Sequence, residues 1–298
     1  MLERLLQKMK SAGVVERFVY INVAVYIIVV FIGVFSVLFN ACGVVDVFMR
    51  LFELPASISG IAARPWSFFV YMFLHGQLLH ILWNMVALYV FGKIFVNFYS
   101  IRHFVGVYIL GGLVGGLFFV LAYNSFPYFR PMVNVSSLVG ASASVLAIVV
   151  ALAMRSPNYR IRLMFVGDVK LSTVAVVAVL MSFFMLSGDN AGGGFAHLGG
   201  VFAGWLVAYM LNKGVDITAV INKPIDWIAT IFSGKRVFKK RKPKFTYSPG
   251  GRSADYRFNE KKKADEAEID AILDKIKKGG YASLSEAEKQ KLFRASSK

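Results

Sequence analysis

The residues of this chain that could do covalent chemistry are a serine and a histidine far apart in the sequence. Ser142 stands in a run of small residues, VGASASV, and His197 stands among glycines, GGGFAHLGG. A serine hydroxyl is a weak nucleophile until a neighbouring base removes its proton, and an imidazole can do this. His80 and Asn84 are four residues apart, so on a helix they share one face. Their N–H groups, with the backbone N–H of Ser142, would suit the oxyanion of a tetrahedral intermediate.

These residue types therefore predict acyl-transfer chemistry. A Ser–His dyad is the simplest arrangement, since no Asp or Glu accompanies either residue in its apolar stretch. Successive helical residues turn by about 100°, so Ser144 projects away from Ser142 and only one of them can face His197. Taken alone, the small residues around Ser142 equally fit a seam that lets helices pack closely.

The elements that must position these residues are apolar stretches. The chain has 298 residues, of which 57% are hydrophobic, and this excludes an ordinary soluble domain. Crossing about 30 Å of hydrocarbon takes about 20 residues. Six stretches suit this, and they predict an all-α membrane protein of six transmembrane helices: 18–39, a span within 68–91, 104–123, 138–154, 171–186 and 195–211.

The positive charges predict the orientation of these spans. Residues 1–17, 92–103, 155–170 and everything after 211 are basic, whereas 40–67, 124–137 and 187–194 are nearly neutral. The two groups alternate, so we expect both termini in the cytoplasm and the even-numbered spans running inward.

This orientation brings the candidate residues to one layer. Counted at 1.5 Å per residue, Ser142, His197 and the His80–Asn84 pair all fall about 5–15 Å below the outer surface. Ionisable side chains at such depth are costly in hydrocarbon and point to function. Gly200 and Gly204 are one turn apart, a spacing that lets the sixth span approach the fourth.

Three motifs resemble those of the rhomboid-family intramembrane serine proteases of bacterial type. They are Gly140-x-Ser142, the run from His75 through His80 to Asn84, and Ala196-His197 followed by Gly200 and Gly204. The resemblance implies Ser142 as nucleophile and His197 as general base. It also implies His80 and Asn84 in the oxyanion site and His75 behind them at the mouth of the second helix.

The same resemblance implies a multi-pass protein of the bacterial cytoplasmic (inner) membrane. It would cleave transmembrane or membrane-adjacent segments of other membrane proteins, with no cofactor and no metal. The expected division is a basic leader (1–17), a six-helix rhomboid-like protease domain (18–212), an amphipathic and polybasic juxtamembrane segment with a linker (213–259) and a cytosolic helical hairpin (260–298).

The net charge of +17 raises the question of nucleic acid. Residues 235–244 carry much of it beside the last span without interleaved stacking aromatics, so we expect anionic lipid there and no nucleic acid. Residues 216–232 suit an amphipathic surface helix that breaks or kinks at Pro224. In the hairpin, Ser283 or Ser285 should cap the last helix.

Three alternatives stay open on the sequence alone. A rhomboid-like protein without catalysis would bind membrane segments for quality control, although such relatives usually lose the serine or the histidine. A transporter predicts inverted repeats and broken helices at the midplane. A zinc site could use the imidazoles of His75, His80 and His197.

Overall fold

The computed structural model describes residues 12–41, 43–163, 167–188, 190–232, 271–272, 274–277, 279–280 and 283–296. The chain divides into two compact units, residues 1–235 and residues 236–298. The basic run 235–244, for which we expect anionic lipid, lies outside the described residues, as do most of the leader 1–17 and of the linker.

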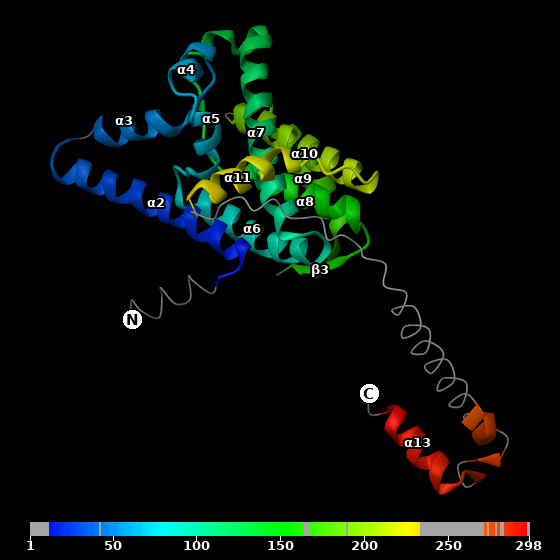
Figure 1. Cartoon of the computed structure of the whole chain (residues 1–298). Helices are drawn as coiled ribbons and strands as arrows, with labels where there is room; N and C mark the ends of the chain where they lie inside the picture. The colour runs from blue at the N-terminus through cyan, green and yellow to red at the C-terminus, as the bar shows by residue number, and fades with distance from the viewer. Residues whose placement is uncertain are drawn as a thin grey trace. The chain divides into compact units, whose positions relative to one another are not determined.

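The first unit is a bundle of helices (Figure 1). In chain order its elements are α2 (Val14–Leu38), α3 (Gly43–Phe52), β1 (Leu54–Pro55), α4 (Ile58–Ala63), α5 (Ser67–Val70), η1 (Tyr71–Phe73), α6 (Leu78–Phe98), α7 (Ile101–Ser125), η2 (Pro127–Met132), β2 (Ser137–Leu138), α8 (Ser142–Arg155), β3 (Arg160–Leu163), β4 (Gly167–Lys170), α9 (Leu171–Met185), α10 (Ala191–Asn212) and α11 (Ala219–Phe232).

The prediction of an all-α membrane bundle is confirmed. Four of the described helices, α2, α6, α7 and α10, are long and apolar enough to cross a membrane. The two remaining predicted spans correspond to the shorter apolar helices α8, of 14 residues, and α9, of 15 residues. Apolar side chains on α2 point outward, for example Phe31, which is 59% exposed, as expected of a helix that faces lipid.

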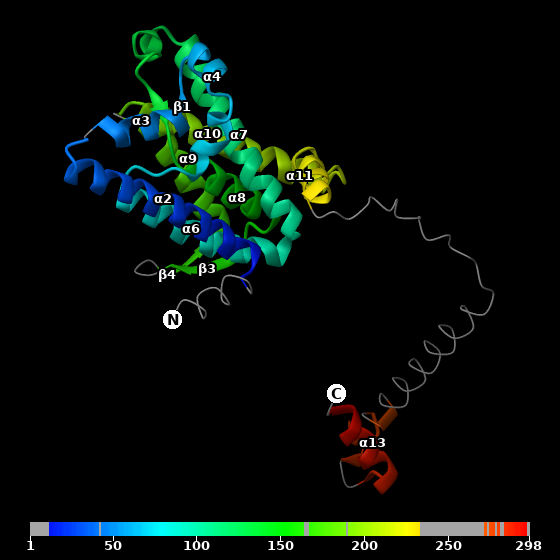
Figure 2. The same ribbon diagram turned by 60° about the vertical axis from the view of Figure 1, so that its left-hand side comes forward.

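The core forms where α10 packs against α7, α8 and α9. Helix α2 lies alongside α6, as both views show (Figure 2). The buried amide of Asn22 fastens α2 to the bundle, because its Nδ2 donates to the Tyr108 hydroxyl at 3.2 Å. Tyr108 in turn donates to the carbonyl of Met72 at 3.1 Å, so three elements share one buried polar chain.

Two small antiparallel sheets depart from the all-helical expectation. Strand β1 pairs with β2 in the register Leu54↔Leu138 and Pro55↔Ser137, which ties the connection before α6 to the loop before α8. Strands β3 and β4 pair Ile161 with Val169, so the predicted loop 155–170 is largely a hairpin.

Several predicted boundaries are wrong by a turn or more. Helix α8 begins at Ser142 rather than at residue 138, and α10 begins at Ala191 rather than at residue 195. The second span is α6, which starts at Leu78, so His75 lies just before this helix, and it ends at Phe98, beyond residue 91. Helix α11 is not broken at Pro224.

The second unit ends in α13 (Glu286–Ser296). Its N-terminus is a capping box: the backbone N–H of Ser285 donates to Glu288 Oε2 at 2.7 Å, and that of Glu288 donates to Ser285 Oγ at 3.4 Å. Lys275, in the preceding helical segment, forms an ion pair with Glu288 at 2.9 Å. Ser285 rather than Ser283 is therefore the cap.

Candidate active site

Ser142 and His197 touch in the structure. Nε2 of His197 lies 2.7 Å from Oγ of Ser142, a hydrogen-bond distance between the first residue of α8 and the second turn of α10. Both residues are half-buried, so their side chains are neither sealed in the core nor displayed on the surface. This is the contact that a serine nucleophile and its general base require.

Two glycines of α10 allow this contact. A Cβ at Gly200 would overlap with the carbonyl oxygen of Ala143, and a Cβ at Gly204 would overlap with that of Ala147. The backbones of α8 and α10 thus approach as closely as only glycine permits. The predicted small-residue face is present, and it lies one turn below the Ser–His contact.

The dyad lies in a cavity of about 270 Å³. Its walls come from the start of α6, the loop before α8, the end of α9 and the start of α10: Gly76, Gln77, His80, Ser137, Leu138, Val139, Ser142, Met185, Asn190, Gly193 and His197. Leu138, Val139 and Met185 contribute apolar surface to this lining, and Gln77, His80, Ser142, Asn190 and His197 contribute polar groups. An extended peptide needs both kinds of surface, one for its backbone and one for its side chains.

The loop that leads into Ser142 is held in an unusual conformation. Gly140 has φ +124°, a region that side chains rarely adopt, and a Cβ there would meet Nε2 of His80 at 2.8 Å. The N–H of Gly140 donates to the carbonyl of Tyr71 at 3.0 Å, and β2 fixes the residues just before it. Ser142 is consequently the first residue of α8, where a helix leaves its N–H groups without partners inside the helix.

The other sequence-predicted residues surround this loop at different distances. His80 lines the cavity. Asn84 is buried beneath it, and its Nδ2 donates to the carbonyl of His80 at 2.9 Å. His75 is fully buried, its Nε2 accepts from the N–H of Ala141 at 3.5 Å, and its ring packs edge-on against His80.

The rival serine points elsewhere. Ser144 is fully buried, and its Oγ lies 4.0 Å from the sulfur of Met72. A Cβ at Gly112 of α7 would lie 2.9 Å from the same Oγ. Ser144 therefore packs between α8 and its neighbours and has no path to His197.

Sequence reasoning missed much of the cavity wall. Asn190 caps α10 by accepting from the N–H of Gly193 at 3.1 Å, a pattern that an Asn three residues before a glycine in GDNAGGG could have suggested. Gln77 lies within the His75–His80 motif, but the sequence predicts no role for it. Met185 could not be predicted as a lining residue, since no sequence pattern marks which residue lies at the end of an apolar helix.

No group of three or more His, Cys, Asp or Glu side chains that could hold a metal ion occurs within the part of the chain that the structure describes.

Comparison with known families gives two matches. The model of the Rhomboid domain matches residues 62–214. Residues 252–298 match a family of unknown function (DUF6576), a range that includes α13. A comparison with curated proteins found no match.

The Rhomboid match spans just over half of the chain and runs from α4 to the turn after α10. It therefore includes every element that lines the cavity and both partners of the 2.7 Å contact. The resemblance seen in the three sequence motifs is confirmed: this multi-pass membrane protein belongs to the rhomboid family, a family of intramembrane proteases.

Proposed function

We propose that this protein is an intramembrane serine endopeptidase that hydrolyses transmembrane or membrane-adjacent segments of other membrane proteins. The observation that carries the proposal is the 2.7 Å contact between His197 Nε2 and Ser142 Oγ inside a polar-and-apolar cavity.

The reaction follows from the two groups. His197 takes the hydroxyl proton of Ser142 while Oγ attacks the carbonyl carbon of the substrate, and the imidazolium then gives that proton to the leaving amine. Water, activated by the same imidazole, hydrolyses the acyl–serine ester and returns the enzyme to its starting state. No carboxylate is needed to balance these steps.

The charge that develops on the carbonyl oxygen needs donors. The backbone N–H of Ser142 is available because this residue starts α8. His80 lines the cavity, and the amide of Asn84, which gives one hydrogen to the carbonyl of His80, has a second to offer. His75 acts as a positioning residue, since it supports the loop at Ala141.

The orientation of the protein in the membrane decides toward which side the cavity opens. We propose six spans with both termini in the cytoplasm of a bacterium and the cavity opening toward the outer face of the inner membrane. Substrate and water then reach the dyad from that side.

Covalent labelling tests the proposal. A fluorophosphonate should label the full-length protein in detergent, label Ser144→Ala equally, and leave Ser142→Ala and His197→Ala unlabelled. Comparison of membrane proteomes from wild-type and Ser142→Ala cells should then reveal lost cleavage products. Folded protein that is never labelled, with unchanged proteomes, would indicate a relative that binds membrane segments without cutting them.

A further inference from the structure

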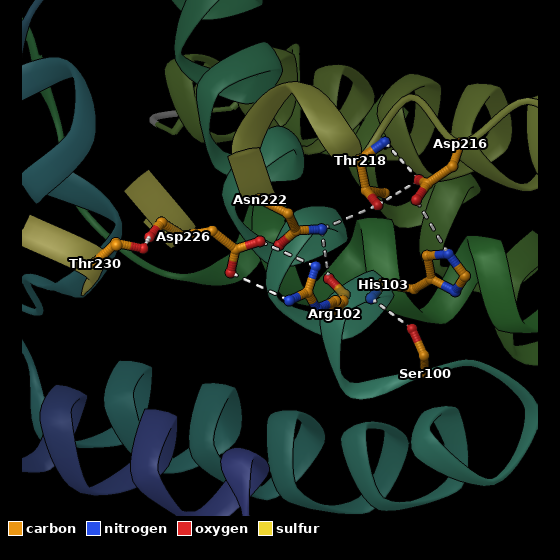
Figure 3. Close-up of polar contacts among 8 residues, drawn as sticks. All are labelled: Ser100, Arg102, His103, Asp216, Thr218, Asn222, Asp226 and Thr230. Carbon is orange, nitrogen blue, oxygen red and sulfur yellow. Dashed lines mark hydrogen bonds and ion pairs between the residues drawn. The ribbon is translucent and has the colours of Figure 1, made fainter. Parts of the chain in front are cut away.

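The segment after the last span is fastened to the start of α7 by polar contacts (Figure 3). Arg102 forms an ion pair with Asp226 at 3.0 Å, and its carbonyl accepts from Asn222 Nδ2 at 3.1 Å. His103 Nε2 lies 3.5 Å from Asp216 Oδ2. We call these five residues the α7–α11 contact.

This contact is close as well as polar. Thr218 is fully buried and Asn222 is 8% exposed. A Cβ at Gly106 of α7 would overlap with the side chain of Thr218, so the two segments meet without space between them. Asp216 accepts from the N–H of Thr218 at 2.9 Å, which fixes the turn that leads into α11. The side of α11 that faces the protein is mixed: Asn222 and Asp226 bond to Arg102 of α7, and Ile221 packs against the core.

The opposite side of α11 is apolar and uncovered by the described residues. Val220 is 70% exposed and Trp227 is 67% exposed. At about 100° per residue, they lie roughly 160° and 140° around the helix from Asn222. The helix therefore points Val220 and Trp227 away from the protein, with the exposed Lys223 beside them.

A helix on a water-soluble protein turns its apolar stripe to the core and polar residues to solvent, whereas α11 also exposes two large apolar side chains, Val220 and Trp227. Exposing such side chains to water costs about 25 cal/mol per Å². Their exposure is favourable where the surroundings of the outward side are themselves apolar.

The position of α11 along the bundle indicates what surrounds its exposed side. It contacts the first turns of α7, at the end of the bundle where α6, α8 and α10 terminate. That end lies at the boundary between hydrocarbon and head groups, where tryptophan is enriched. Lys223 and Lys213 are exposed nearby, and Lys213 lies over the ring of Tyr209 at 4.6 Å.

We propose that α11 is an interfacial helix whose partner is the lipid bilayer. Its apolar residues Val220 and Trp227 lie among the lipids just below the head groups, while the α7–α11 contact holds Asn222 and Asp226 on the bundle. The proposal is independent of catalysis, because none of these residues lines the cavity that holds the dyad.

Fluorescence quenching of Trp227 tests this in the full-length protein. Trp66, Trp83 and Trp205 are replaced by Phe, and the protein is placed in nanodiscs of phosphatidylcholine and phosphatidylglycerol brominated at either shallow or deep acyl positions. Shallow bromines should quench Trp227 most, and aqueous acrylamide should quench it weakly. A protein that keeps only Trp83, which is 69% exposed on α6, gives the reference for a transmembrane position.

Each other result overturns the proposal. Strong acrylamide quenching with weak bromolipid quenching would place α11 in water. Resistance to both quenchers would mean that protein covers Trp227, either a second copy or the second unit. Maximal quenching by deep bromines would make α11 a membrane-inserted rather than an interfacial helix. Should the triple replacement not fold, the difference between wild type and Trp227→Phe under the same quenchers gives the same answer.

Discussion

Ser142 derives its proposed reactivity from where its helix begins. As the first residue of α8 it keeps a free backbone N–H, and its Oγ meets His197 while the rest of the helix continues into the core. Gly140, with its φ of +124°, produces this start because it turns the chain sharply next to the ring of His80. On our proposal, the nucleophile and one oxyanion donor thus belong to a single residue.

We predict that Asn84→Ala lowers turnover by about 10²–10³-fold with the fold intact, because it removes one oxyanion donor, an effect of about 2.7–4 kcal/mol. The measurement is the steady-state rate on a transmembrane reporter in nanodiscs, with thermal unfolding as the check on the fold. Asn97→Ala, an exposed site on the same helix, is the matched control and should leave the rate unchanged. An unaltered rate for Asn84→Ala would remove the residue from the oxyanion site.

Individual site residues could be predicted from the sequence where the chemistry allows only a few residue types. Ser142, His197 and His80 were picked out because hydroxyl and imidazole groups are rare in apolar spans, and all three line the cavity. Asn84 does not line the cavity, and its amide donates to the carbonyl of His80. Spacing along the helix does not predict this, because the side-chain rotamer decides which acceptor the amide reaches. The apolar lining residues Leu138, Val139 and Met185 could not be predicted, because the chain is rich in such residues.

Among the helices, the α8–α10 pair carries the site. We predict that Gly200→Ala forces the two helices apart, because its methyl group would overlap with the carbonyl of Ala143. Fluorophosphonate labelling should be lost, and unfolding should become easier by about 1–3 kcal/mol, the usual cost of overpacking.

Gly33→Ala in α2 is the control for this substitution, since its Cβ would meet only Val45 Cγ2 at 3.9 Å. It should label and unfold like wild type. Equal labelling of Gly200→Ala and Gly33→Ala would mean that the close approach is not needed for the dyad.

The last helix offers a test that depends on pH. The backbone N–H of Ser285, and then Lys275, lower the pKa of Glu288 to about 2 from its ordinary 4.5. A depressed carboxyl stabilises the fold above its unfolded pKa and loses that contribution as pH falls through the folded value. Protection of 286–296 from hydrogen exchange, corrected for intrinsic rates, should therefore fall between pH 4.5 and 2 in the full-length protein. In Glu288→Gln this decline should be absent; a decline of equal size there would contradict the assignment.

Helix existence was predictable from apolar length, but helix boundaries were not. Residues 138–141 read as helix because they are small and apolar, yet pairing of β2 with β1 and the turn at Gly140 keep them out of α8. Of the predicted break or kink at Pro224, the break is absent: α11 continues, and contacts of Asn222 and Asp226 with Arg102 hold the turns on both sides. Tertiary contacts decided both cases, and no local pattern reveals them.

The arrangement of the whole chain in the membrane is a prediction from charge. In a Cys42→Ser background, we expect a membrane-impermeant maleimide to label Val135→Cys in intact spheroplasts. Asn158→Cys should be labelled only after permeabilisation. Both side chains are exposed, Val135 at 83%, so accessibility differs only by side. The reverse pattern would invert the orientation and turn the cavity toward the cytoplasm.

The two compact units meet at residues 235 and 236, whereas the division predicted from composition places boundaries at 212 and 259 and stays a prediction. The anionic-lipid site at 235–244 stays a prediction from charge. Which apolar residues of α11 stay exposed could not be predicted, because an amphipathic pattern does not say which side faces the protein. The burial of Asn222 and the exposure of Trp227 decide it.

The shortness of α8 has a consequence for what happens to a cut substrate. Its 14 residues span about 21 Å, some 9 Å less than a hydrocarbon core of about 30 Å, and on our proposal the shortfall lies at the Ser142 end. On our proposal a substrate helix severed at that level is divided unequally. One fragment keeps roughly 14 apolar residues and stays anchored, while the other keeps about six and is too weakly held to remain. Departure of the smaller fragment would then make scission irreversible, and its recovery in the soluble fraction would measure this.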